Sequence, residues 1–390
     1  MNESCLVTNF AYGTGPYLRT TELAVAFNDE LESRGMARMP IVVPWVYGER
    51  QRNVMLEEFG ALAERNPGEI LLDAVLGGLL HSVFYTGARR YDDSLKNWLA
   101  NGERVSRDAK RHLQGTLDVQ TLGGERNRLD GQRIALELNR SPRIRYGVAP
   151  SYSTTFGYVA DILERAADLP AGTVDVAPAL LTAGAAYANV IESDQAAHCM
   201  AYPATFSFDA SYLDRHQATL VPPITDLPKS RGETLERDGI YVTVTGIEGL
   251  ERLYREAGEL GLELYSNDPH AVPGSIGMLP SVIADPRIRF HFARAGWGSL
   301  WLSLYLGVPV VVPSYDPTDD PEIYFNNIAL KKLGFGIVYE GQPLGEILAQ
   351  SEDCRARART LREEIIAKWG TFNGNNVCAK LFVNSFLSSA

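Results

Sequence analysis

Short runs of β-branched and aromatic residues alternate with longer helical stretches along most of this 390-residue chain. Residues 4–10 and 40–47 have the composition of strands, and residues 18–33 between them carry apolar side chains at helical spacing. The same pattern predicts a helix, a strand and a helix further along, at 92–113, 143–149 and 156–167. Strands that alternate with helices are typical of a parallel sheet covered by helices, so we predict the α/β class.

The length predicts two domains, because one compact core holds about 150 to 200 residues. The composition changes over residues 225–238, a polar stretch that contains Pro228 and Gly232. A second series of predicted elements follows, with strands at 240–245, 262–266, 288–292 and 308–312 and a helix at 249–260. We therefore predict a first domain at 1–228 and a second at 229–374.

The charge excludes one class of partner. With a formal net charge of −11, the chain lacks the excess of Lys and Arg that a general nucleic-acid surface needs. A small anionic ligand remains compatible with this charge. Backbone N–H groups at a helix N-terminus attract anions whatever the net charge of the protein.

The spacing of the cysteines and the hydropathy predict the cellular compartment of the protein. Cys5, Cys199, Cys354 and Cys378 lie far apart without the spacing of a metal or redox pair, so they are predicted to be free thiols. There is no run of about 18 apolar residues and no secretory signal, which predicts a cytoplasmic protein. The apolar stretch at 70–85 is predicted to be buried; a docking face for peripheral membrane contact is the alternative.

The strongest functional signal follows the strand at 288–292, where the sequence reads Arg294-Ala295-Gly296-Trp297-Gly298-Ser299. Glycines at 296 and 298 let the backbone approach a diphosphate, and a helix that opens at Ser299 points its N–H groups at the same place. Arg294 would add a bidentate cation. The alternative is a glycine turn that serves packing alone. Trp297 either packs against a neighbouring helix or forms a wall of the ligand site.

This turn belongs to a longer segment that resembles the donor box of inverting glycosyltransferases with the GT-B fold. Gly296, Trp297 and Ser299 resemble the box of small-molecule UDP-glycosyltransferases. Arg294 and the run Glu322-Ile323-Tyr324-Phe325-Asn326 resemble instead the N-acetylglucosaminyltransferase that completes the lipid-linked peptidoglycan precursor. The resemblance covers residues 239–344. In the N-terminal half it rests on the turn Gly13-Thr14-Gly15 and on residues 22–26.

The resemblance implies an α/β architecture of two Rossmann-like domains facing each other across a cleft, with a final helix in 375–390 that crosses back to the first domain. It implies transfer of a hexose-type sugar from a nucleotide sugar to an acceptor hydroxyl, with inversion and without a cofactor or a metal. The loop Gly277-Met278-Leu279-Pro280 resembles the one that reads uracil, which points to a UDP-sugar. Glu322 stands where the family contacts sugar hydroxyls, with Asn326 one helical turn later, and Thr245-Gly246 would assist at the diphosphate.

Two departures from the family concern the ribose and the catalytic base. Leu302 stands where both branches have the glutamate that holds the ribose hydroxyls. Either a polar neighbour such as Ser303 replaces it, or the protein binds its nucleotide differently or weakly. Where relatives have a histidine in the first glycine-rich loop, this chain has Pro16-Tyr17. Tyr17, His81 and Asp92 are the candidate bases, each with a structural role as its alternative.

Two other functions stay open. A non-hydrolysing sugar-nucleotide epimerase shares the two-domain architecture, but it would need acidic and histidine side chains that converge on the sugar, and the chain has six histidines. A non-catalytic partner subunit that kept the donor fold would explain the absent glutamate and histidine. The acceptor is unknown from the sequence, whether lipid, natural product or sugar, and so is the oligomeric state.

Overall fold

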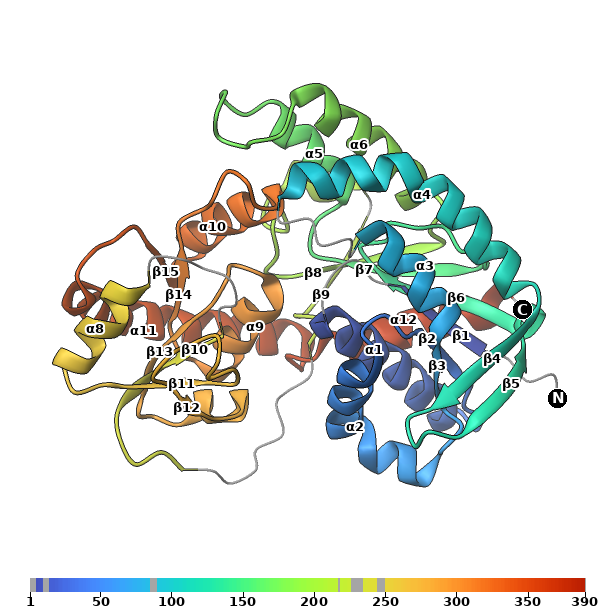
Figure 1. Ribbon diagram of the computed structural model, residues 1–390, viewed down its shortest axis with the longest axis horizontal. Coiled ribbons are helices and arrows are strands. Elements are labelled where there is room, and N and C mark those ends of the chain that lie inside the picture. Colours follow the sequence, from blue (N-terminus) through green and yellow to red (C-terminus); the bar gives the residue numbers. More distant parts are fainter. Residues whose placement is uncertain are drawn as a thin grey trace.

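The computed structural model describes residues 5–9, 14–84, 90–216, 218–225, 234–243 and 250–389. Two sheets, each covered by helices, form two lobes (Figure 1). The first lobe, in blue and green, holds the N-terminal part of the chain, and the second, in yellow and orange, holds most of the C-terminal part. This arrangement confirms the predicted α/β class with two doubly wound units.

The first sheet has nine strands in the described chain, in the order β5-β4-β3-β2-β1-β6-β7-β8-β9. Their bounds are β1 (Cys5–Asn9), β2 (Ile41–Pro44), β3 (Ile70–Asp73), β4 (Thr116–Thr121), β5 (Arg126–Asp130), β6 (Ile134–Arg140), β7 (Ser151–Thr155), β8 (Ala197–Ala201) and β9 (Thr219–Val221). In this spatial order, β3, β2, β1, β6, β7, β8 and β9 pair in parallel. At one edge of the sheet, β4 pairs antiparallel with β3 and with β5. The helices of this lobe are α1 (Thr14–Ser33), α2 (Gly48–Arg65), α3 (Ala74–Phe84), α4 (Tyr91–Leu113), α5 (Val159–Ala167), α6 (Pro178–Glu192) and α7 (Ala210–His216).

The central strands of this sheet are buried because helices cover both of its faces. Every residue of β2 and β3 is buried, which is why their sequences are nearly continuous apolar runs and do not alternate. Helix α1 packs on one face, where Leu23 and Phe27 belong to the same core as Ile41 and Val43. The sheet therefore presents its strand ends, and not its faces, to ligands.

The second sheet has six strands in the described residues, all paired in parallel, in the order β12-β11-β10-β13-β14-β15. Their bounds are β10 (Gly239–Val242), β11 (Glu263–Ser266), β12 (Ile276–Gly277), β13 (Ile288–Phe292), β14 (Val310–Pro313) and β15 (Gly336–Tyr339). Its helices are α8 (Glu251–Glu259), α9 (Trp297–Leu306), α10 (Pro321–Leu333) and α11 (Leu344–Trp369). The predicted domain boundary at residue 228 lies in the segment 226–233, outside the described residues.

The last helix, α12 (Gly374–Ser389), leaves the second lobe and packs against α1 of the first. Figure 1 shows the C-terminus on the side of the first lobe. The rings of Phe382 and Tyr152 stack with their centroids 5.1 Å apart, and those of Phe386 and Phe27 lie 6.1 Å apart. The chain therefore enters the first lobe twice, once at each end.

Most predicted elements are confirmed, but the strand predicted at 143–149 is wrong. Strand β6 ends at Arg140 and the next strand begins at Ser151. Between them Ser141 has a φ of 49° and Gly147 a φ of 72°, which lie outside the extended region. The side chains of Ile144 and Tyr146 are buried in the core, so this coil segment has the apolar composition of a strand without the backbone of one.

Two predictions about buried residues can also be compared with the structure. Of the apolar stretch at 70–85, residues 70–84 are described and form β3 and α3, and Leu76, Leu80 and Val83 of α3 are buried in the core, which supports burial over membrane docking. Cys199, Cys354 and Cys378 are free thiols as predicted. Residues 169–218, which have no clear sequence pattern, contain α6, β8 and α7.

We expect Phe382→Ala to lower the free energy of unfolding by about 3–5 kcal/mol, because its fully buried ring stacks on Tyr152. Leu381→Ala is the matched control, since Leu381 is 38% exposed on the same helix. Urea unfolding of both variants measures the effect. Equal losses for the two variants would contradict the docking of α12 on the first lobe.

Candidate functional site

Doubly wound sheets bind ligands at the carboxyl ends of their strands, at the point where the strand order reverses. In the first sheet this point lies between β1 and β6, and in the second between β10 and β13. Arg140 is the last residue of β6, and Phe292 is the last residue of β13. The residues at these two strand ends are therefore the expected positions of a site.

The segment after β13 leads directly into α9. Gly296 is the N-cap and the helix begins at Trp297, two residues before the predicted start. The first N–H groups of a helix have no partner within it and attract anions. Neither Gly296 nor Gly298 has a positive φ, and a Cβ atom on either would meet no atom of the described residues within 4 Å. Neither backbone strain nor packing requires these glycines, and the space before α9 is open.

Arg294 lies just before this helix start, but its guanidinium is already paired. Nε donates to Oδ2 of Asp319 at 2.9 Å, and Nη2 donates to the other carboxylate oxygen. Asp319 belongs to the acidic segment between β14 and α10. The Arg294 side chain is 47% exposed, so a phosphate that approaches it competes with Asp319.

A buried hydrogen-bond network joins α9 to α10 and to the first lobe. Trp297 Nε1 donates to Thr205 Oγ1 at 2.9 Å and to Asn326 Oδ1 at 2.8 Å, and Thr205 Oγ1 donates to Asn326 Oδ1 at 2.8 Å. Asn326 Nδ2 donates to the carbonyl of Ala295 at 2.8 Å and to Glu322 Oε1 at 2.9 Å.

This network changes the roles predicted for Trp297 and Asn326. Trp297 is 1% exposed and Asn326 is fully buried, so neither side chain is accessible to a donor. Of the two alternatives for Trp297, the structure shows packing. Both side chains hold the start of α9 in place, and the prediction that these side chains contact the donor is corrected accordingly.

Further contacts between the lobes surround this network. Trp301 Nε1 donates to the carbonyl of Pro203 at 2.7 Å, and the rings of Phe206 and Phe325 lie 5.3 Å apart. Helix α10 also contacts α5 of the first lobe (Figure 1). These contacts place the start of α9 at a defined position against the first lobe.

Glu322 lies in the first turn of α10, where its backbone N–H donates to Oδ1 of Asp320 at 2.9 Å. Burial and then the charge of Asp320 raise the pKa of Glu322 to about 7, although the hydrogen bond from Asn326 and the charges of Arg294 and Arg143 lower it. Burial also raises the pKa of Asp320. Glu322 therefore changes its charge near neutral pH.

The residues at the predicted ribose position offer no carboxylate. Leu302 packs against an apolar cluster of the second lobe. Ser303 is fully buried, and its hydroxyl lies 2.7 Å from Nδ1 of His291, so it cannot replace the missing glutamate. Nε2 of His291 lies 2.6 Å from Thr243 Oγ1. Burial lowers the pKa of His291 to about 3, so this imidazole is neutral at physiological pH.

The three candidate bases lie on three helices of the first lobe. Tyr17 of α1 is fully buried, and the prediction that it is a base is corrected for that reason. His81 is exposed in the last turn of α3. Asp92 lies in the first turn of α4 and is paired with Lys96. Helix α4 begins at Tyr91, whose N–H is hydrogen-bonded to the segment after β14 at 2.9 Å, so Asp92 lies near the second lobe.

The remaining predicted donor contacts are placed as follows. Gly13, Thr245 and Gly246 lie outside the described residues, and Thr14 and Gly15 begin α1 with side chains that are not described. The carbonyl of Met278 accepts a hydrogen bond from Tyr241 at 2.8 Å. Leu279 is the N-cap of the short 3-10 helix Pro280–Ala284. Ser299 is partly exposed in the first turn of α9.

Sequence reasoning missed four residues: Arg140, Thr205 and Asp319 near the junction of the lobes, and His291 in the interior of the second lobe. Thr205 and His291 are buried and act through hydrogen bonds to residues distant in the sequence. The acidic composition of 316–322 was a visible signal for Asp319. No sequence signal pointed to Arg140, because the strand that it ends, β6, was not predicted.

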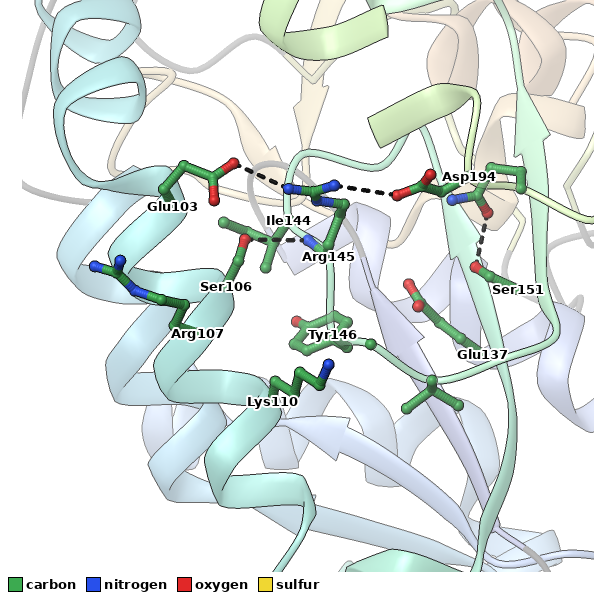
Figure 2. Close-up of a pocket in the computed structure, with 13 residues that line it drawn as sticks. Glu103, Ser106, Arg107, Lys110, Glu137, Ile144, Arg145, Tyr146, Ser151 and Asp194 are labelled. Atoms are coloured by element: carbon green, nitrogen blue, oxygen red, sulfur yellow. Dashed lines mark hydrogen bonds and ion pairs between the residues drawn. The ribbon is translucent and has the colours of Figure 1, made fainter. Parts of the chain in front are cut away.

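A cavity of about 370 Å³ lies elsewhere in the first lobe, between α4, β6 and the segment 144–148 (Figure 2). Arg145 is held there between Glu103 at 3.1 Å and Asp194 at 3.3 Å. All of its lining residues belong to the first lobe. The cavity is therefore separate from the site at α9.

Within the described ranges, no group of three or more His, Cys, Asp or Glu side chains is arranged to hold a metal ion. No helix in the described part of the chain is both long and apolar enough to cross a membrane.

Comparisons with known proteins identify the fold. No family model matches the chain, and no curated protein matches its sequence. The structure of TcCGT1 in complex with UDP matches with a TM-score of 0.65 at 11% identity, over 100% of both chains. UGT71G1 of Medicago truncatula, complexed with UDP-glucose, matches with a TM-score of 0.61 at 12% identity, over 98% of both chains.

The calicheamicin glycosyltransferase CalG4 matches with a TM-score of 0.59 at 16% identity, over 100% of this chain and 99% of that one. At such low identity the likeness shows the fold alone. The chain thus has the two-domain GT-B fold of glycosyltransferases, as the sequence resemblance predicted.

We expect opposite effects from the two members of the Arg294–Asp319 pair if Arg294 binds a diphosphate. Arg294→Ala should weaken binding of UDP about tenfold or more, because it removes a charge-assisted hydrogen bond. Asp319→Asn should tighten UDP binding, because it removes the competing carboxylate. Calorimetric titration measures both.

The exposed pair of Arg289 and Asp238, 2.6 Å apart in the same lobe, supplies matched controls. Arg289→Ala and Asp238→Asn should leave the affinity for UDP unchanged. Weaker UDP binding in both Arg294→Ala and Asp319→Asn would show that the Arg294–Asp319 pair has only a structural role.

We expect Glu322→Gln to change how stability depends on pH. Because the folded pKa of Glu322 is raised, its contribution to stability is complete at acid pH and is lost as the pH rises through about 7. The stability of Glu322→Gln relative to wild type should therefore increase between about pH 5 and about pH 8. Thermal unfolding across this range measures it, with the exposed Glu259→Gln as control. A difference from wild type that is constant with pH would contradict the raised pKa.

Proposed function

We propose that this chain transfers a hexose-type sugar from a nucleotide sugar, specifically a UDP-sugar, to an acceptor hydroxyl with inversion and without a metal. The observation that carries the proposal is the N-terminus of α9, which opens onto free space at the point where the strand order of the second sheet reverses. Two of the matched structures, TcCGT1 and UGT71G1, are complexes with UDP and UDP-glucose.

The N-terminus of α9 is placed to stabilise the leaving group of the transfer reaction. When the bond between the anomeric carbon and the diphosphate breaks, negative charge develops on the leaving phosphate. N–H groups of Trp297 and Gly298 at the start of α9 stabilise such charge without moving. Arg294 adds a positive charge there once a phosphate displaces Asp319.

In the proposed inverting reaction, the two lobes hold the two reactants. The acceptor oxygen attacks the anomeric carbon from the side opposite to the leaving group, and its proton passes to a base. With the diphosphate held by the second lobe, the attacking hydroxyl comes from the first. Asp92 is the candidate base that the structure favours, because α4 begins beside the segment after β14.

Glu322 is proposed to bind the sugar. Oε1 accepts the hydrogen bond from Asn326, whereas Oε2 has no hydrogen-bond partner among the described residues. Oε2 is therefore available to accept a hydrogen bond from a sugar hydroxyl. Asn326 supports this contact by holding the carboxyl group in place.

Incubation with a panel of UDP-, dTDP- and GDP-sugars tests the proposal, and we expect release of UDP from UDP-sugars. Gly298→Ala should abolish most of this release, because its Cβ tilts towards the helix N-terminus and occupies the space of the phosphate. The same substitution should leave the free energy of unfolding unchanged or raise it by up to about 1 kcal/mol, because alanine favours helix.

Gly258→Ala is the matched control. Gly258 is also helical, and a Cβ atom there would meet no described atom within 4 Å; its substitution should leave UDP release unchanged. Conversion of the donor to another sugar nucleotide would identify an epimerase. A thermal shift with UDP-sugars but no turnover would identify a partner subunit without catalytic activity.

A further inference from the structure

Arg140 reaches from the first lobe to the helix that carries the proposed diphosphate site. It is the last residue of β6, beside β1, where the strand order of the first sheet reverses. The residue is buried, with 7% of its surface exposed. Its Cζ atom lies 5.2 Å from the ring centroid of Trp301 in α9 and 5.5 Å from that of Phe156.

The guanidinium of Arg140 forms no hydrogen bond and no ion pair with any residue that the structure describes. Burial and then the charge of Arg19 lower the pKa of Arg140 to about 10, so it is still a cation at neutral pH. A contact with an aromatic ring stabilises a cation by less than the cost of removing several N–H donors from water. Arg38, by contrast, is paired with Glu69 at 2.6 Å.

The charges of two carboxylates influence Arg140 without pairing with it. The charges of Glu22 in α1 and Glu322 in α10 raise its pKa. Each already has another partner, since Glu22 is paired with Arg19 and Glu322 accepts a hydrogen bond from Asn326. Neither carboxylate therefore pairs directly with Arg140, whose N–H groups have no partner among the described residues.

The backbone directly after Arg140 is held in an unusual conformation. Ser141 has a φ of 49°, which residues other than glycine rarely adopt, and it is buried. Its N–H donates to the carbonyl of Thr154 at 3.1 Å. Such conformations persist where their surroundings enforce them and are frequent at functional sites. This turn ends the strand at Arg140 and keeps that residue at the carboxyl end of a central strand.

We propose that Arg140 binds the carboxylate of a substrate and that this substrate is the acceptor; the inference rests on the proposed transfer function. A guanidinium that lies over aromatic rings keeps its in-plane N–H groups, which match the two oxygens of a carboxylate. Arg140 belongs to the lobe opposite the donor helix. The acceptor is therefore a hydroxyl compound that carries a carboxylate. A uronic acid donor is the other source of this group.

Calorimetric titration of the full chain with benzoate and with benzamide, its neutral counterpart, tests the anion site. Wild type is expected to bind benzoate at least about tenfold more tightly than benzamide, and Arg140→Met to lose this preference, because a hydrogen bond to a charged group changes affinity roughly 10- to 100-fold. Equal binding of both ligands by wild type, or an unchanged preference in Arg140→Met, would overturn the proposal.

Arg165→Met is the matched control for this titration. Arg165 also lies over an aromatic ring, 4.2 Å from that of Phe206, but it is paired with Asp209 at 3.5 Å. The variant should therefore keep the wild-type preference for benzoate. Loss of the preference in Arg165→Met as well would overturn the assignment to Arg140.

The Tm values of the two variants distinguish a binding role of Arg140 from a structural role. An unpaired buried cation destabilises the free protein, so Arg140→Met is expected to raise Tm, whereas Arg165→Met, which removes a paired arginine, is expected to lower it. A fall in Tm for Arg140→Met as large as that for Arg165→Met would show that Arg140 has a structural role and would overturn the proposal.

Titrations with acceptor analogues and with UDP-sugars test whether the carboxylate belongs to the acceptor or to the donor. In the presence of UDP, Arg140→Met should raise the Kd of para-hydroxybenzoate about tenfold or more and leave that of para-hydroxybenzamide nearly unchanged. The Kd values of UDP-glucose and UDP-glucuronate should change equally. A loss confined to UDP-glucuronate would assign the carboxylate to the donor and overturn the acceptor assignment. These titrations need no turnover, so failure of the transfer function and failure of the anion site are distinguishable.

Discussion

The amide of Asn326 joins the three parts of the molecule on which the site depends. It is hydrogen-bonded to Trp297 at the start of α9, to Thr205 in the first lobe and to Glu322 in its own helix. Because Asn326 is fully buried, removal of one partner would leave a polar group unsatisfied, at a cost of about 1–3 kcal/mol. The start of α9 is thereby held against the first lobe while the space in front of it stays open.

The charges around this junction are arranged for a ligand more than for stability. The pKa of Glu322 is raised to about 7 by burial and by Asp320, and Arg140 is a buried cation without a carboxylate partner in the described chain. Each feature destabilises the free protein and would be relieved by a bound group of the right charge or hydrogen bonding. Departures from full internal pairing of this kind are expected at functional sites.

Local patterns predicted much of the fold because buried strands and amphipathic helices are visible in sequence; the strand at 288–292 and the turn after it are examples. The segment 143–149 was mistaken for a strand because its apolar side chains are buried in a coil. The roles of Trp297 and Ser303 could not be predicted, since they depend on Thr205 and His291, which are distant in sequence. Arg140 has no motif around it, and its environment exists only once α9 of the other lobe packs beside it.

A crystal structure of the full chain with UDP would show whether the N-terminus of α9 binds the diphosphate of a nucleotide sugar. We expect phosphate oxygens within hydrogen-bond distance of the N–H groups of the first turn of α9, with the bonds among Trp297, Thr205 and Asn326 intact. UDP bound without contact to α9, for example in the cavity of about 370 Å³ in the first lobe, would contradict this binding mode.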